Sequence, residues 1–184
     1  MTSLKLTGLS FAAGSLFLAC VAAVGSANPP AGAGDGKGQV RLGTFDSRSI
    51  AVAHFKSPEY DAYLKGLFQE LEQAKQDGDE QRVQELEAFG PALQKKMHEQ
   101  GFSTASVADI LKKIEDQLPG IAEQAGVDVI VSKWDLAYQG SGAELVDVTD
   151  LLVAAFHPGE EGLKTAREIR KHEPVPMDQL DHEH

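Results

Sequence analysis

Residues 57–97 have the sequence SPEYDAYLKGLFQELEQAKQDGDEQRVQELEAFGPALQKKM, which carries the signals of two helices joined by a short turn. Ser57 suits the N-cap of the first helix, and Pro58 and Glu59 suit its first turn. Apolar side chains then recur at three- and four-residue spacing, which places them on one helical face. They are Tyr60, Tyr63, Leu64, Leu67, Phe68 and Leu71.

A second amphipathic helix is predicted after the interruption at residues 77–79. Its apolar residues are Val83, Leu86, Phe89, Leu93 and Met97. Two such helices joined by a short turn are expected to lie antiparallel, because each then covers the apolar stripe of the other. Residues 58–100 therefore predict a helical hairpin with arms of about 25–30 Å, at 1.5 Å per residue. Gly90-Pro91 in the second arm predicts a kink near Phe89.

Short strands and further helices are expected on both sides of the hairpin. In order, they are a strand over 40–45, a helix-like segment from Asp46, the hairpin, a third helix over 103–125 that bends at Pro119 and ends at Gly126, a buried strand over 127–131, a strand over 144–148 and a short helix to Phe156. This order predicts an α+β fold in which a small β body of short strands carries the projecting hairpin.

The N-terminal residues 1–27 have the pattern of a signal peptide. Lys5 precedes an apolar stretch, and small residues with Ala27 at their end suit a cleavage site. An uncleaved membrane anchor is the alternative, and Cys20 lies in a segment that loosely resembles the acylation box of bacterial lipoproteins. With cleavage after Ala27 the mature chain has no cysteine and no disulfide, and no later segment is apolar enough to span a membrane.

Two polar segments bound the expected folded body at residues 40–156. Residues 28–39 are rich in Gly and Pro and predict a flexible linker. Residues 157–184 predict a polar C-terminal tail, disordered over 172–184, with one helix possible around 163–169. The formal net charge of −11 indicates that the chain is repelled by nucleic acid and by anionic lipid.

The C-terminal half of the body carries the most specific pattern. A helix ending in Ala125-Gly126 precedes Val-Asp-Val-Ile-Val at 127–131, then Ala137-Tyr138 in a turn, then Val-Asp-Val-Thr-Asp at 146–150 before Leu151-Leu152. This succession resembles the OmpH/Skp family of periplasmic chaperones, which has a strand with Asp among aliphatic residues, an Ala-Tyr turn and an Asp-x-Thr cap on a last helix. The resemblance covers residues 40–56 and 104–156.

The resemblance implies an exported homotrimer located in the periplasm or cell envelope. In that family the strands of three subunits close a small barrel, and the hairpins project around a cavity that holds unfolded clients. The present chain departs from it in having short arms with ten acidic and five basic side chains over residues 58–100, whereas the family's surface is strongly basic. Fold is therefore expected to carry over better than function.

Binding to other polypeptides, without a cofactor, is the function that this pattern favours. The protein is expected to act as a holdase or envelope assembly factor on unfolded or envelope proteins. Client contact is assigned to the apolar stripe of the first arm, by apolar contact rather than by charge: Tyr60, Tyr63, Leu67 and Phe68. The alternative is a structural or scaffolding envelope protein with the same fold and no chaperone activity.

The sequence offers few patterns typical of a catalytic or metal-binding site. It contains no nucleophile elbow, no His-Glu-x-x-His and no paired-cysteine spacing. Asp46, Ser47 and His54 share one segment, but turn, cap and helix positions explain them better than catalysis does. Trp134 is expected to fill the core. One cluster has metal-ligand character and is better explained as a solvated tail: Asp178, Asp181, His182, Glu183 and His184.

Overall fold

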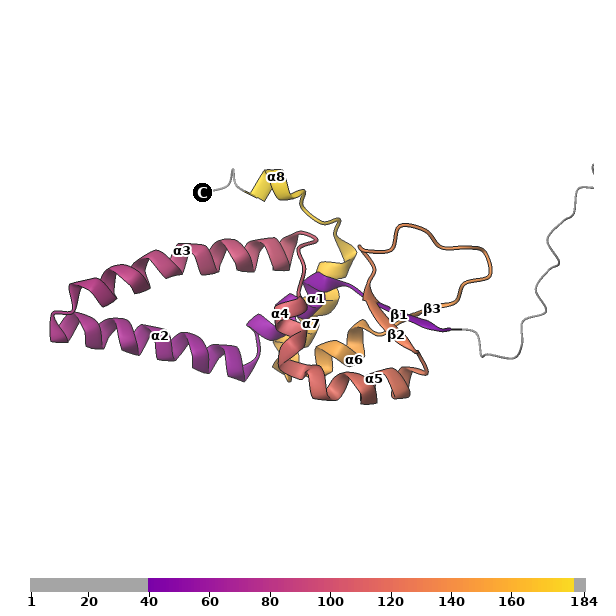
Figure 1. Cartoon of the computed structure of the whole chain (residues 1–184), viewed down its shortest axis with the longest axis horizontal. Helices are drawn as coiled ribbons and strands as arrows, with labels where there is room; N and C mark the ends of the chain where they lie inside the picture. Colours follow the sequence, from indigo (N-terminus) through magenta and orange to yellow (C-terminus); the bar gives the residue numbers. More distant parts are fainter. Residues whose placement is uncertain (1–39, 181–184) are drawn as a thin grey trace, which may run out of the picture. The chain divides into compact units, whose positions relative to one another are not determined.

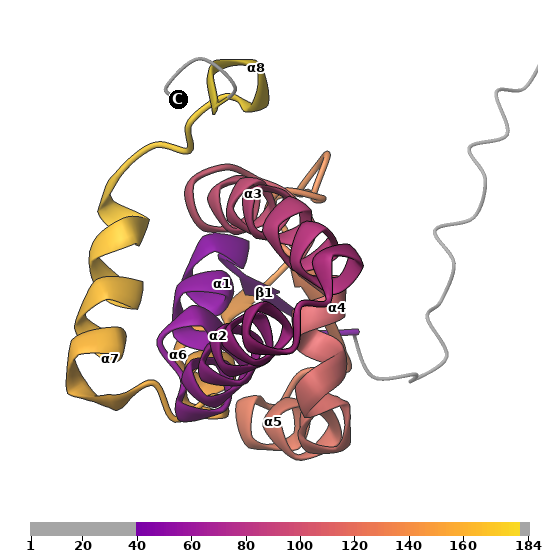
Figure 2. The ribbon, with the colours of Figure 1, turned by 90° about the vertical axis from the view of Figure 1, so that its left-hand side faces the viewer.

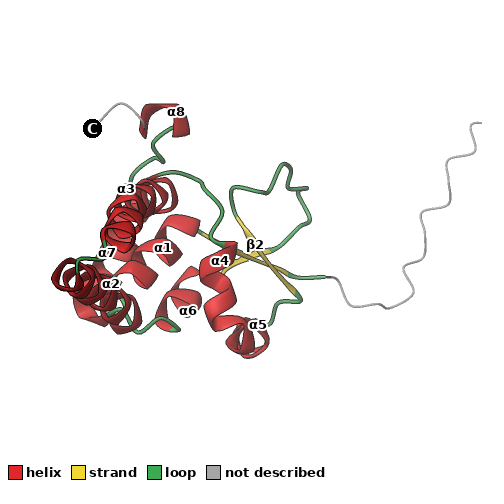
Figure 3. Cartoon of the chain, turned by 60° about the vertical axis from the view of Figure 1, so that its left-hand side comes forward, coloured by secondary structure: helices red, strands yellow, loops and turns green. Residues whose placement is uncertain are grey.

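The structure is a computed structural model, and it describes residues 40–180 (Figure 1). The expected signal peptide at 1–27 and the linker at 28–39 lie outside the described residues. Over the described residues the chain is a mixture of helices and one small sheet (Figure 3). This agrees with the predicted α+β class.

Three parallel strands form the sheet, in the order β2-β1-β3. They are β1 (Leu42–Phe45), β2 (Val129–Ser132) and β3 (Leu145–Asp147), and Leu42 lies opposite both Val129 and Leu145. Parallel neighbours require a long crossover, and the hairpin with the helices that follow it supplies the connection from β1 to β2. The central strand needs a glycine at residue 43, because a Cβ there would lie 3.0 Å from a methyl group of Val148.

Helix α1 (Ser47–Phe55) is the centre of the body. It packs against α3, α6 (Thr149–Ala154) and α7 (Gly159–Glu168), as Figure 2 shows. Its residues from Ser47 to Ala51 are all buried, the polar ones included. Because polar residues usually lie at the surface of a protein, this burial requires internal hydrogen-bond partners.

The hairpin consists of α2 (Pro58–Asp77) and α3 (Glu80–Phe102). The Ser57 side chain accepts a hydrogen bond from the backbone N–H of Tyr60, as its N-cap position predicts. Gly78 ends α2 in the left-handed conformation, with φ of 71°. Pro91 lies inside α3 and does not end it.

The predicted third helix is wrong as a single element. Residues 108–125 are divided into α4 (Ala108–Leu111), the 3₁₀ helix η1 (Lys112–Gln117) and α5 (Leu118–Ala125). Ile114 is buried with non-helical φ and ψ of −121° and 20°, which interrupts the continuous helix. The predicted stop is confirmed, because Gly126 caps α5 with φ of 64°.

The strand predicted to be buried at 127–131 is partly exposed. Val127 belongs to the core, but Val129 is 46% exposed on the edge strand β2. Strand order is the reason, since β1 rather than β2 occupies the centre of the sheet. The aliphatic residues around Asp128 did not distinguish a central strand from an edge strand.

Part of the predicted polar tail at 157–184 belongs to the folded body. Helix α7 packs on α1, where Ala166 is buried and its carbonyl accepts a hydrogen bond of 2.7 Å from the Ser49 hydroxyl. The chain continues through η2 (Ile169–Lys171) to α8 (Met177–Leu180). The backbone N–H of Val175 donates to the carbonyl of Phe102 on α3.

Among residues 40–180, no helix combines the length and the apolar character that a bilayer crossing requires.

Val148 and Val129 provide a matched test of the core. Val148→Asp is expected to unfold the protein, because Val148 is fully buried and an unpaired buried carboxylate costs several kcal/mol, a large part of a domain's typical stability of about 5–15 kcal/mol. Val129→Asp is expected to retain the fold, because that side chain reaches solvent. Thermal unfolding followed by circular dichroism measures both, and equal losses would contradict the assignment of the core.

Candidate functional site

An apolar groove lies between α2 and α3. It has a volume of about 220 Å³. Gln94 is its only polar lining side chain among the described residues; the others are Leu64, Leu67, Phe68, Leu71, Leu86, Phe89, Gly90, Leu93 and Met97. Both arms of the hairpin therefore contribute to one apolar surface.

The groove is open because the two arms cover each other incompletely. Phe68 is 66% exposed and Phe89 is 42% exposed, and the leucines beside them are only partly buried. The apolar stripe of an amphipathic helix is about 100° wide or more, and a single neighbouring helix covers only part of it. The expectation that each arm would cover the stripe of the other is met only in part.

The residues predicted to bind clients fall into two places. Leu67 and Phe68 line the groove, and Tyr63 is exposed on the same arm. Tyr60 is only 4% exposed, and its hydroxyl donates to the Met97 sulfur at 3.0 Å. Tyr60 is therefore an anchor at the base of the hairpin, and its assignment to client contact is not supported in the single chain.

The α3 half of the groove was not assigned to client contact from the sequence. Leu86, Phe89 and Leu93 have the same spacing signal as the first arm, so a sequence signal existed. These residues of the second arm were interpreted only as covering the apolar stripe of the first arm. How completely two helices cover each other's stripes depends on the distance between them, which the spacing of apolar residues does not specify.

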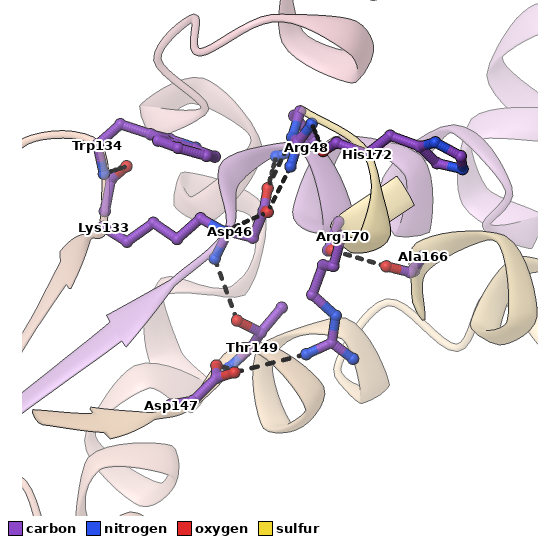
Figure 4. Close-up of polar contacts among 11 residues, drawn as sticks. Asp46, Arg48, Lys133, Trp134, Asp147, Thr149, Ala166, Arg170 and His172 are labelled. Carbon is purple, nitrogen blue, oxygen red and sulfur yellow. Dashed lines mark hydrogen bonds and ion pairs between the residues drawn. The ribbon is translucent and has the colours of Figure 1, made fainter. Parts of the chain in front are cut away.

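A second cluster, of buried ions, lies at the end of β1 (Figure 4). The Asp46 carboxylate accepts hydrogen bonds from Arg48 at 2.9–3.1 Å and lies 2.7 Å from the Lys133 ammonium. Asp46 and Arg48 are each 1% exposed. Lys133 and Arg48 also lie over the Trp134 ring, at 4.3 and 5.2 Å from its centroid.

These contacts keep Asp46 ionised. Burial raises the pKa of a carboxyl group, but the hydrogen bonds from Arg48 and Lys133 outweigh it, and the pKa of Asp46 lies below its ordinary value. Arg48 also donates to the carbonyl of His172 at 2.8 Å, which holds the C-terminal segment against α1. The cluster is thus a connection between elements. Trp134, which was expected to fill the core, is only partly buried and packs against the cations of Lys133 and Arg48 instead.

Asp46, Ser47 and His54 do not form a catalytic arrangement. Asp46 is engaged by cations, and Ser47 and His54 lie seven residues apart on α1, about 10 Å along its axis. His54 packs instead against the rings of Phe55, Tyr60 and Phe156.

Metal ligands were sought over the same residues. No group of three His, Cys, Asp or Glu side chains is arranged for a metal ion within residues 40–180. The cluster at 178–184 lies largely outside the described residues.

Comparisons with protein-family models, with curated proteins and with solved structures found no match to this chain. The likeness to the OmpH/Skp family stays a prediction from the residues quoted above.

Asp46→Ala tests the buried cluster. The substitution leaves the Arg48 guanidinium buried without its partner, so a loss of about 3–5 kcal/mol in the free energy of unfolding is expected. Lys133→Met is the control and is expected to cost much less, because Lys133 reaches solvent. Urea unfolding measures both, and an equal or smaller loss for Asp46→Ala would contradict the connecting role.

The buried His54 predicts a pH dependence of stability. Its pKa is lowered by burial and by Lys113, against the opposing charges of Glu59 and Asp109. In the unfolded chain His54 takes up a proton near pH 6.5, whereas in the folded chain it does so only at lower pH. The contribution of His54 to the free energy of unfolding is therefore fully present above about pH 6.5 and falls as the pH drops below it. For one group the slope is at most about 1.4 kcal/mol per pH unit.

His54→Phe isolates this contribution. Its free energy of unfolding is expected to change less than that of the wild type between pH 7 and pH 5, and the other histidines contribute equally to both proteins. Asp46 and Asp109, whose pKa values are lowered, lose their stabilising effect only below about pH 4. Parallel pH profiles for the two proteins would show that His54 is not the group responsible.

Proposed function

We propose that this chain is an exported polypeptide-binding protein, a holdase or envelope assembly factor, that holds apolar segments of other proteins in the groove between α2 and α3. The observation that carries the proposal is the open apolar groove itself, with the exposed rings of Phe68 and Phe89 at its two arms. Covering these rings with a client chain removes apolar surface from water, which is worth about 25 cal/mol per Å².

The chemistry of the lining favours a polypeptide over a small ligand. Small-molecule sites combine apolar walls with a few placed polar groups that orient the ligand, and among the described lining residues only Gln94 is polar. Leucine, phenylalanine and the flexible Met97 instead suit varied side chains, as in grooves that accept an amphipathic helix.

The proposed assembly is a homotrimer with a Skp-like body. Within the described chain β2 and β3 each pair only with β1, so each presents one edge without a strand partner. Open edges of this kind are paired or covered in stable proteins. Pairing between subunits would close the sheets and bring three hairpins around a shared client space. Export to the periplasm or cell envelope rests on the pattern of residues 1–27.

Phe68→Ser with Phe89→Ser tests the groove. The double variant is expected to lose suppression of aggregation of an unfolded envelope protein, because the two most exposed lining rings are removed. Phe102→Ser with Tyr138→Ser is the matched control, since both rings are exposed and neither lines the groove. Light scattering checks that all three proteins have the same mass, expected to be that of a trimer.

Two outcomes would contradict the proposal. Equal suppression by both double variants would place client binding outside the groove. No suppression by the wild-type protein at any ratio would favour the alternative, a scaffolding envelope protein, which the short acidic arms suit.

A further inference from the structure

We infer that the groove selects segments in which basic side chains accompany apolar ones, and that it disfavours acidic segments. This inference rests on the proposed function and adds the chemistry of the client. Apolar burial supplies the affinity, and the charges around the groove supply the choice between clients.

The basic side chains of the hairpin are already engaged by carboxylates of the same chain. Each of the five over residues 58–100 has an acidic partner within 4.0 Å: Lys65 with Asp61, Lys75 with Glu72 and Glu87, Arg82 with Glu70 and Glu85, Lys95 with Glu99, and Lys96 with Asp109. On residues 58–100 an acidic client therefore meets only cations that are already paired. The same segment carries ten carboxylates, so negative charge remains in excess.

Two of these carboxylates are placed beside the exposed rings. Glu72 follows Phe68 by four residues on α2, and Glu85 precedes Phe89 by four residues on α3. Residues four apart share a helical face, so each groove ring has an acidic neighbour. The side chains of Glu72 and Glu85 are 68% and 49% exposed. Glu72 lies 3.9 Å from Lys75, which also pairs with Glu87, and Glu85 lies 2.8 Å from Arg82, which also pairs with Glu70. Each of these cations is therefore shared by two carboxylates, which leaves one negative charge in excess beside each ring.

The negative charge of the hairpin also favours a basic client over a second copy of the chain as the occupant of the groove. Another hairpin in the groove would bring a second excess of carboxylates against the first, and such like-charge contacts are unfavourable. A segment with lysine or arginine beside its apolar residues instead places opposite charges against Glu72 and Glu85. At physiological salt the Debye length is about 8 Å, so charges at the mouth of the groove still act on a bound segment.

Three synthetic peptides test the selectivity. They share one length and one set of leucine and phenylalanine positions, and their polar positions are all Lys, all Gln or all Glu. Binding to the full chain is measured by fluorescence anisotropy at about 0.05 M and 0.5 M salt, where the Debye length is about 14 Å and 4 Å. The Lys peptide is expected to bind about tenfold tighter than the Gln peptide at low salt and the Glu peptide weakest, with the differences shrinking at high salt.

Glu72→Gln with Glu85→Gln tests the two carboxylates. This variant is expected to lose most of the preference for the Lys peptide while binding the Gln peptide as the wild type does. Glu115→Gln with Glu123→Gln is the matched control, because it removes the same charge from exposed positions in η1 and α5. Retention of the full preference in the Glu72 and Glu85 variant would overturn their role.

The remaining outcomes separate this inference from the proposed function. Equal affinity for the three peptides, or tighter binding of the Glu peptide, overturns the selectivity. Binding in the groove still stands in that case if Phe68→Ser with Phe89→Ser abolishes peptide binding. No binding of any peptide to the wild type overturns both. A fall in assembled mass in the Phe68 and Phe89 variant would identify a second copy as the occupant and overturn the inference.

Discussion

The buried carboxylate of Asp46 is the contact on which the arrangement of the body depends. It lies where β1 passes into α1, caps that helix by accepting from the Arg48 N–H, and binds the cations of Arg48 and Lys133. Its backbone N–H donates to the Thr149 hydroxyl at the start of α6. One residue thereby connects β1, the chain after β2 and the chain after β3. A buried ion pair is costly unless its hydrogen bonds are complete, so these segments are held in one arrangement.

The body leaves the hairpin to pack largely against itself. Helix α1 is surrounded by α3, α6 and α7, and Tyr60 at the base of α2 adds ring contacts with His54 and Phe55. Beyond that base each arm has one neighbour, and ion pairs such as Arg82 with Glu70 join the arms from their polar sides. The groove is the consequence, because two helices cannot bury two wide apolar stripes between them.

Local signals were the reliable part of the sequence. Ser57 and Gly126 act as the cap and the stop predicted for them, Gly78 ends α2 within the predicted interruption, and the spacing of apolar residues placed both arms. What failed depended on contacts between distant segments. The strand order put β1 at the centre and left Val129 exposed, and the side chains of Asp46 and Ser49 became buried because Lys133 and α7 supplied their partners. Of the four residues assigned to client contact, two line the groove, and the buried position of Tyr60 could not be inferred from helical spacing alone.

Surface charge and core packing respond to different constraints in this chain. Exposed ion pairs on a helix contribute little to stability, about 0–1 kcal/mol each, so the carboxylates along the arms can change without altering the fold. The core residues cannot change so freely, since a Cβ added at Gly43 would lie 3.0 Å from a methyl group of Val148. A Skp-like pattern in the body and an acidic hairpin are therefore compatible in one protein. The pattern of the body bears on folding and on the proposed assembly, whereas the sign of the charge on the arms bears on which polypeptides the proposed binding groove would accept.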